Sequence, residues 1–175
     1  MWDADVYKRA LDFAARAHKS QTMQGSDLPY IVHLTKVAAE VMLASAYEPA
    51  IDATLAVTCA LLHDSIEDAG ITKEQLAAEF GQSVADGVDA LTKRESVPKD
   101  DRMRDSLERI AAQPKEIAMV KLADRITNLE PAPAHWSAEK RAAYREEAKQ
   151  ILSALRGKSV WLETRLAKKI LEYAA

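Results

Sequence analysis

The chain has 175 residues, of which 48% are hydrophobic and 29% are charged, and its formal net charge is −3. This length predicts one domain with its own core, and the weakly acidic charge argues against a protein whose main function is to bind nucleic acid. With only five glycines and many alanines, the composition favours helices over strands and turns.

The first third of the chain reads as helices joined by short connections. Apolar residues recur at helical spacing from Val6 to Ala17, and the polar segment from Ser20 to Pro29 ends this helix. A second helix follows, with apolar residues on one side from Leu34 to Met42. The segment from Ile51 to His63 is apolar nearly all round, which predicts a central buried helix.

The rest of the chain continues in the same way. Thr72 and Gln75 match a capping box, and Val84 to Leu91 suits the next helix. The charged stretch from Arg94 to Arg104 predicts a surface loop or the entrance to a helix. The last three helices are expected to begin at Pro114, Ser137 and Ser159. We therefore expect an all-α fold, in a single domain over residues 1–175.

The chain start and the cysteine content bear on location. Met1-Trp2-Asp3 lacks the basic start and apolar stretch of a secretory signal, and no run is long enough to span a membrane. We expect a cytoplasmic protein with no membrane partner. The single cysteine, Cys59, lies in an apolar run, so it is expected in the core; a catalytic thiol would need an exposed electropositive setting.

Four polar residues follow the most apolar helix: His63, Asp64, Glu67 and Asp68. Polar groups at the end of a buried helix are costly unless they are paired, and a metal ion is an efficient partner. If the helix continues, His63 lies one turn from Glu67, and Asp64 lies one turn from Asp68. The alternative interpretation is an ordinary helix end with solvated charges.

Two more residues extend this candidate metal site. His33 lies near the start of the second predicted helix, and Asp124 ends another apolar face. Two imidazoles and two carboxylates with open positions suit Mn²⁺, Fe²⁺ or Zn²⁺ acting as a Lewis acid. A closed structural zinc site would favour thiolates instead.

Five stretches in this order carry a family resemblance: His18 with Gln21, PYIVH at 29–33, ALLHDSIED at 60–68, LTK at 91–93 and KLADRITNL at 121–129. On these residues the chain resembles the hydrolase domain of RelA/SpoT-type proteins of the HD superfamily. In size it is similar to the stand-alone small alarmone hydrolases. The resemblance runs from about Ala10 to Tyr173.

The resemblance implies an HD-type helical bundle with a metal in a central cleft. It implies a Mn²⁺ site with four ligands: His33, His63, Asp64 and Asp124. It gives Glu67 and Asp68 a role in activating water. The implied reaction removes the 3′-diphosphate from ppGpp or pppGpp and releases pyrophosphate, so the expected partner is a small nucleotide.

Basic and polar residues near these motifs are candidates for binding the nucleotide. Basic side chains can bind its phosphates, and the candidates are Lys19, Lys93, Arg94, Arg102 and Arg104. The alternative for each is a solvated surface charge, and Lys93 is favoured because it lies in a matching stretch. Asn128, one turn after Asp124, suits the sugar or base, or a helix cap. Tyr144 suits the nucleotide or the core, and a structural role is expected for His18.

The loop before Pro29 departs from the family. The family usually has an arginine there that stacks on guanine, and this chain has Met23. A methionine still packs on a purine but carries no charge. The adenosine analogues ppApp and pppApp are therefore candidate substrates too. Leu34 also stands where the family commonly has proline.

Two other functions stay open at this stage. One is a phosphatase for another phosphorylated nucleotide such as NADPH. The other is a nucleotide-sensing module with a vestigial metal site, against which the intact Glu67 and Asp68 argue. The sequence leaves open the base, the number of 5′-phosphates, the metal used in the cell, and whether the protein is a monomer or a small homo-oligomer.

Overall fold

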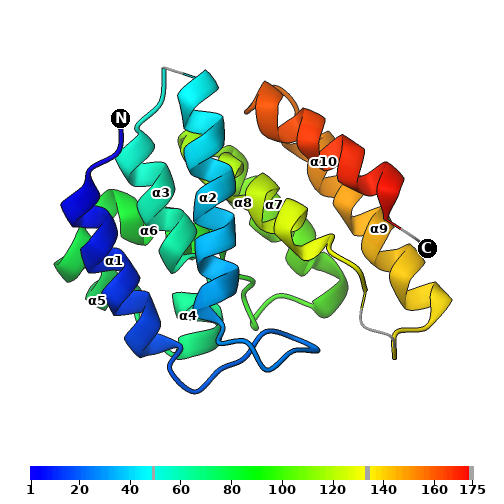
Figure 1. The fold of residues 1–175 in the computed structure, drawn as a ribbon, viewed down its shortest axis with the longest axis horizontal. Coiled ribbons are helices and arrows are strands. Elements are labelled where there is room, and N and C mark those ends of the chain that lie inside the picture. The colour runs from blue at the N-terminus through cyan, green and yellow to red at the C-terminus, as the bar shows by residue number, and fades with distance from the viewer. Residues whose placement is uncertain (49, 133–134, 174–175) are drawn as a thin grey trace.

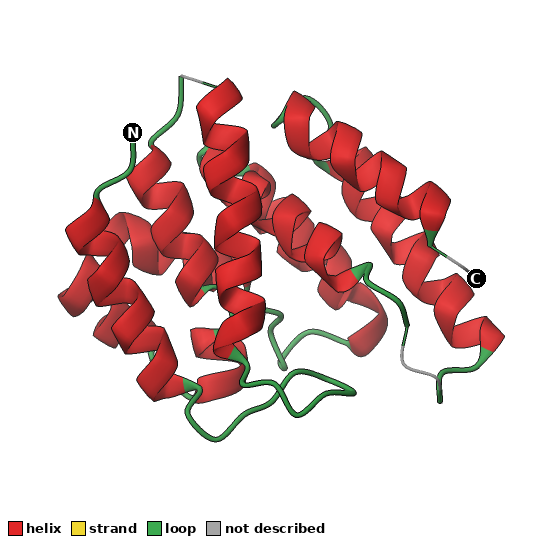
Figure 2. Cartoon of the chain, viewed as in Figure 1, coloured by secondary structure: helices red, strands yellow, loops and turns green. Residues whose placement is uncertain are grey.

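The computed structural model describes residues 1–48, 50–132 and 135–173. Within these residues the regular elements are helices, joined by loops (Figure 2), and one isolated bridge pairs Thr22 with Pro29. The helices are α1 (Ala4–Ala17), α2 (Ile31–Tyr47), α3 (Ala53–Leu62), α4 (Ser65–Ala69), α5 (Lys73–Phe80), α6 (Gln82–Leu91), the 3₁₀ turn η1 (Lys99–Asp101), α7 (Arg102–Ala111), α8 (Lys115–Asn128), α9 (Ala138–Ala154) and α10 (Val160–Glu172). The predicted all-α fold is confirmed.

Three helices form the centre of the molecule. α2, α3 and α8 pack against one another, and α1 and α6 pack on α3. α9 and α10 lie side by side at the other end of the molecule and pack on α8 (Figure 1). No helix in the described part of the chain is both long and apolar enough to cross a lipid bilayer.

The central helices α3 and α8 are both buried but differ in composition. All buried side chains of α3 are apolar apart from Thr58, as its sequence predicts. α8 is buried continuously from Glu116 to Thr127, and this buried run includes Lys121, Asp124 and Arg125. The core therefore encloses charged groups on one of its own helices.

Several sequence signals for helix ends are confirmed. The capping box of Thr72 and Gln75 is present, and the side chains of Ser137 and Ser159 accept hydrogen bonds from backbone N–H groups in the first turns of α9 and α10. Cys59 is fully buried, and burial raises the pKa of its thiol, as a core role requires.

The helix does not continue through residues 63–68, so the condition under which His63 would lie one helical turn from Glu67 is not met. α3 ends at Leu62, and α4 starts at Ser65. Asp64 between them has φ −98° and ψ 2°, which is outside the helical range. This break turns the chain at the motif, so the side chains of His63 and Asp64 lie side by side instead of on separate faces of one helix.

Candidate metal centre and nucleotide cleft

Four side chains from different elements meet at the centre of the molecule. His33 comes from the first turn of α2, His63 and Asp64 from the junction of α3 and α4, and Asp124 from α8. The Nε2 atoms of His33 and His63 are 3.4 Å apart. Oδ2 of Asp64 lies 3.0 Å from Nε2 of His63 and 3.8 Å from that of His33. Oδ1 of Asp124 lies 3.5 Å from Nε2 of His33 and 3.7 Å from that of His63.

The donor set fits a divalent cation. Ligand atoms of His33, His63 and Asp64 all lie within 4.8 Å of one another, and Asp124 approaches both imidazoles. Donors about 2.0–2.2 Å from a common metal are separated by distances of this size. Nδ1 of His63 is 2.8 Å from the carbonyl oxygen of Ala60 and must donate to it, because a carbonyl only accepts. Nε2 is thereby left to face the carboxylates, the usual orientation of a metal-binding histidine.

The electrostatics of the cluster call for positive charge at its centre. Burial alone would raise the pKa of Asp64, but the charge of His63 and the hydrogen bonds from His63 and Tyr30 lower it to about 2. Burial opposes ionisation of Asp124 too, yet Lys121 and the two imidazoles hold its pKa well below the ordinary value. Burial disfavours the charged form of His63, but the two carboxylates raise its pKa well above the usual range. A divalent cation held by all four residues would supply this positive charge itself.

Three neighbours orient the two carboxylates. The Tyr30 hydroxyl donates to Oδ2 of Asp64 at 2.6 Å. Nδ2 of Asn128 donates to Oδ1 of Asp124 at 2.5 Å, and Nζ of Lys121 donates to Oδ2 of Asp124 at 3.2 Å. Sequence reasoning missed Tyr30 and Lys121 and assigned Asn128 only to the nucleotide or to a helix cap. The spacing of Lys121 and Asn128 from Asp124, three and four residues along one helix, was the available signal.

Glu67 and Asp68 on α4 lie beside the cluster. They line a cavity of about 190 Å³ together with His63, Asp64 and Asp124. Oε2 of Glu67 accepts a hydrogen bond from the backbone N–H of Lys93 at 2.9 Å. Burial, followed by the charges of Asp64 and Glu67, raises the pKa of Asp68. Both carboxyl groups are therefore placed to bind water next to the cluster.

His18 and Gln21 connect the first loop, which joins α1 to α2, to the helix α4. Nδ1 of His18 donates to Oε1 of Gln21 at 2.7 Å, and Nε2 of Gln21 donates to the carbonyl oxygen of Asp68 at 2.6 Å. The His18 ring also stacks on Tyr30, with ring centroids 5.2 Å apart. This geometry is that of a structural residue, which is the role expected for His18.

A second cavity of about 300 Å³ adjoins the first. It is lined in part by Met23, His33, Thr127, Trp136 and Tyr173. Three further residues, Tyr30, Asn128 and Tyr144, line both cavities. The structure thus brings Met23, Asn128 and Tyr144 to one cleft beside the four-residue cluster. Trp136 and Tyr173 were not anticipated, because single aromatic residues outside any motif give no signal in one sequence.

The predicted phosphate-binding residues divide into two groups. Lys93, Arg94 and Arg102 line a third cavity of about 690 Å³, which also includes Glu67 and Asp68. The guanidinium of Arg102 donates to the carbonyl oxygens of Val97 and Glu95 at 3.0 and 3.1 Å, so it also fixes this loop.

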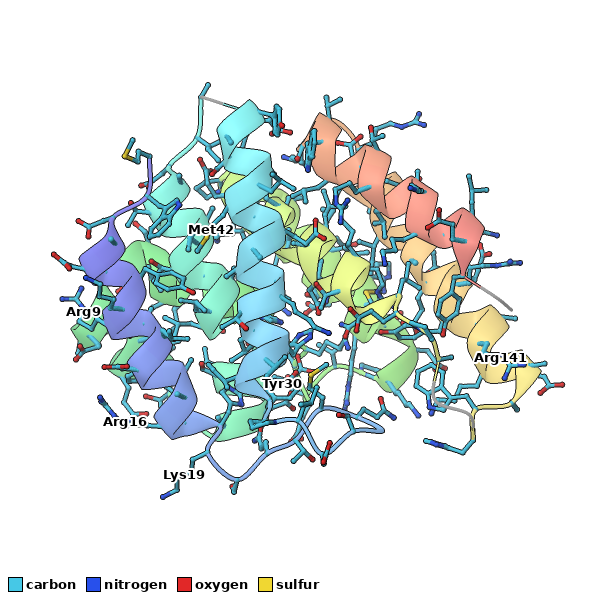
Figure 3. All side chains as sticks on the ribbon, viewed as in Figure 1. Arg9, Arg16, Lys19, Tyr30, Met42 and Arg141 are labelled. Carbon is cyan, nitrogen blue, oxygen red and sulfur yellow. The ribbon has the colours of Figure 1, made fainter. Side chains whose placement is uncertain are left out.

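Lys19 and Arg104 are not brought to the cleft. Lys19 is exposed and points outward at the edge of the molecule, whereas Tyr30 lies where the first loop meets α2 (Figure 3). Arg104 is paired with Asp101 on the surface at 2.8 Å. Neither residue lines the three cavities described above.

Comparison with known proteins shows the family of the chain. The HD domain family model matches residues 10–161. The guanosine-3′,5′-bis(diphosphate) 3′-pyrophosphohydrolase MESH1 of Danio rerio is 34% identical over 172 residues, covering 95% of this chain and 93% of that protein. The human MESH1 is 33% identical, with 90% and 88% covered. A solved structure described as a metazoan ortholog of SpoT that hydrolyses ppGpp superimposes with a TM-score of 0.84 at 28% identity, covering 98% of this chain and 97% of that one. The chain therefore belongs to the HD domain family, and its relatives include small hydrolases of the RelA/SpoT type.

Proposed function

We propose that this protein is a divalent-metal-dependent 3′-pyrophosphohydrolase that acts on ppGpp. The observation that carries the proposal is the cluster of His33, His63, Asp64 and Asp124 with two further carboxyl groups in the same cavity. Relatives that match the chain over nearly its whole length bear the name of this activity. The active unit is proposed to be one HD-type domain over residues 1–175, working in the cytoplasm.

The proposed reaction is a hydrolysis at the 3′ position. A water oxygen attacks the phosphorus attached to O3′, the P–O3′ bond breaks, and O3′ takes a proton. The products are GDP and pyrophosphate. The bound cation, proposed to be Mn²⁺ in preference to Zn²⁺ or Fe²⁺, supplies Lewis acidity toward water and phosphoryl oxygens.

The chain's own residues supply the remaining chemistry. Glu67 or Asp68 accepts the proton of the attacking water, since both line the cavity that contains the cluster. Tyr30 and Asn128 hold Asp64 and Asp124 in position through hydrogen bonds of 2.6 and 2.5 Å. Fixed orientation of this kind preserves both the affinity for the cation and the rate.

The two adjoining cavities fit the two parts of the nucleotide. The base and ribose occupy the larger one, with Met23 and Tyr144 available for stacking. The 3′-diphosphate occupies the smaller one, beside the cluster. Lys93 and Arg102, in the groove next to Glu67, provide positive charge for phosphate oxygens.

The direct test is a nucleotide panel. Purified protein is incubated with ppGpp, pppGpp, ppApp, pppApp and NADPH, each with Mn²⁺ or with excess chelator. Pyrophosphate and GDP should appear from ppGpp only when the metal is present. Release of orthophosphate from NADPH alone would favour the nucleotide phosphatase, and binding of ppGpp without any turnover would favour the sensing module.

A second candidate substrate is the adenosine analogue of the alarmone. Met23 lines the larger cavity. By the family resemblance, it stands where an arginine usually stacks on guanine. An arginine that reaches from the face to the edge of the base can donate hydrogen bonds to guanine O6 and N7, but meets the amino group of adenine as a second donor. The thioether of methionine stacks on either purine. We therefore propose that the preference for guanine is weak and that ppApp and pppApp are also hydrolysed.

The matching experiment compares kcat/KM for pppGpp and pppApp in the wild type and in Met23→Arg. Contacts of this type differ by about 1–3 kcal/mol between bases, so the substitution should shift the ratio toward guanine by about one to two decades. A wild type with a strong preference for guanine that Met23→Arg leaves unchanged would show that position 23 does not read the base.

A further inference from the structure

Arg125 is a buried cation whose donors are incompletely used. The residue is 4% exposed, and its Nη2 donates to Oε2 of Glu147 at 3.2 Å. Its guanidinium carbon lies 4.3 Å from the centre of the Tyr144 ring. The buried Nε and Nη1 atoms have no hydrogen-bond partner among the described residues. Leaving charged donors unpaired in the interior is unfavourable, so a structural role alone does not account for Arg125.

Its surroundings show where a partner would come from. Arg125 lines the cavity of about 190 Å³ that contains His63, Asp64 and Asp124. Two lysines line the same cavity and already face carboxylates. Nζ of Lys121 is 3.2 Å from Asp124, and Nζ of Lys93 is 3.9 Å from Glu67. Among the described residues that line this cavity, Arg125 is the cation with buried donors that have no hydrogen-bond partner.

Building on the proposed function, we propose that Arg125 binds the 3′-diphosphate of the substrate. A planar guanidinium can give two parallel hydrogen bonds to phosphoryl oxygens, and its charge does not titrate. When the P–O3′ bond breaks, the diphosphate departs as pyrophosphate, and Arg125 stabilises the negative charge on its oxygens. Arg125 is therefore a substrate-binding residue, separate from the four candidate ligands and from Glu67 and Asp68.

Two residues of α9 hold the guanidinium in place. Tyr144 lies under its face, and Glu147, one turn later, binds Nη2. Glu147 also lines the cavity, but its side chain is 47% exposed and reaches solvent. Tyr144 also lines the cavity of about 300 Å³ that is proposed to hold the base and ribose. Tyr144 is therefore proposed both to stack on the base and to support Arg125 at the diphosphate.

The test uses the two products as separate probes of the same site. Binding of inorganic pyrophosphate and of GDP is measured by titration calorimetry at a fixed Mn²⁺ concentration. Arg125→Gln should weaken pyrophosphate by about 10- to 100-fold, as expected for the loss of charge-assisted hydrogen bonds, and leave GDP nearly unchanged. The kcat/KM for ppGpp should fall at least as much as the pyrophosphate affinity.

The matched control is Arg165→Gln. Arg165 also joins two helices through a glutamate, donating from Nε to Glu40 at 2.6 Å, but it lines none of the three cavities of the site. Its loss should leave both affinities unchanged. A second variant, Arg125→Met, guards against misfolding because its apolar side chain can still pack on Tyr144. It should fold, as judged by its melting temperature, and should lose pyrophosphate binding to the same degree.

Each result separates the two proposals. Unchanged pyrophosphate affinity in Arg125→Gln and Arg125→Met, or equal weakening of pyrophosphate and GDP, overturns the assignment of Arg125. A wild type that releases no pyrophosphate from ppGpp overturns the proposed function instead.

Discussion

The two buried helices at the centre, α3 and α8, differ in what they contribute. α3 buries apolar side chains on all sides, and its functional groups, His63 and Asp64, come only after its last residue. α8 is equally buried but carries Lys121, Asp124 and Arg125 within its length. Buried charges lower stability unless they are paired, so α3 serves the core alone, whereas α8 serves both the core and the site.

The largest effect is expected from removing the charge that α8 brings to the cluster. Asp124→Asn should abolish pyrophosphate release, because it replaces an anionic donor by a neutral amide. The fold should persist, since the amide oxygen can still accept from one of the two donors, Lys121 or Asn128, which bond separate oxygens of the carboxylate at 3.2 and 2.5 Å. Activity is measured as pyrophosphate release and metal content by elemental analysis.

Asp124→Ala sharpens the same comparison. It leaves the buried Lys121 without its partner, so the free energy of unfolding should fall by about 3–5 kcal/mol in urea titrations. His63→Ala, which changes the residue directly after α3, should also abolish activity. Full activity of these variants, or of the wild type in excess chelator, would rule out the metal-dependent mechanism.

The next effect concerns the acidic pair on α4. Glu67→Gln should lower kcat by about a hundredfold or more and leave KM nearly unchanged, if Glu67 takes the proton of water. The glutamine keeps an oxygen for the Lys93 N–H, which Glu67 now accepts at 2.9 Å, so the loop should remain in place. A loss confined to KM would make Glu67 a binding residue, and Asp68→Asn measured alongside it shows which carboxyl group is the base.

The contrast between α3 and α8 also explains what could be predicted from the sequence. The apolar run of α3, the capping residues and the helical periodicities depend on local patterns, and these gave the all-α fold. The four cluster residues were proposed because polar groups stand at the ends of apolar helical faces, and the motifs around them also match a known family. The break at Asp64 was not predicted, because it depends on how α4 packs against the distant helices α1 and α6, which no local pattern records.

The remaining residues of the site depend on contacts between distant elements. Trp136 and Tyr173 reach the cleft only because α9 and α10 pack on α8, and no local pattern records this. Lys19 was chosen by its charge near a motif, yet its side chain is directed outward. Arg125 lies within a matching stretch, but its unpaired donors become visible only in the packed interior.

The smallest effect on catalysis is expected from a substitution on α6, where this helix packs against both α3 and α8. A methyl group added at Gly87 would lie 2.5 Å from Cδ1 of Ile117 on α8 and 3.1 Å from Sγ of Cys59 on α3. Helix propensity alone would make Gly87→Ala stabilising by about 1 kcal/mol. Overpacking in a dense core costs about 1–3 kcal/mol, so we expect net destabilisation in urea titrations and unchanged kcat and KM for the folded protein.

A double-mutant cycle with Ile117→Val distinguishes the two terms. Valine lacks the Cδ1 atom nearest to the added methyl, so Gly87→Ala should cost less in the Ile117→Val background than in the wild type. The difference measures the clash directly, because the helix-propensity contribution is the same in both backgrounds. Equal effects in the two backgrounds would mean that the contact with Ile117 is relieved without cost. A loss of kcat in the folded Gly87→Ala variant would show instead that the packing of α6 against α3 and α8 also affects catalysis at the site.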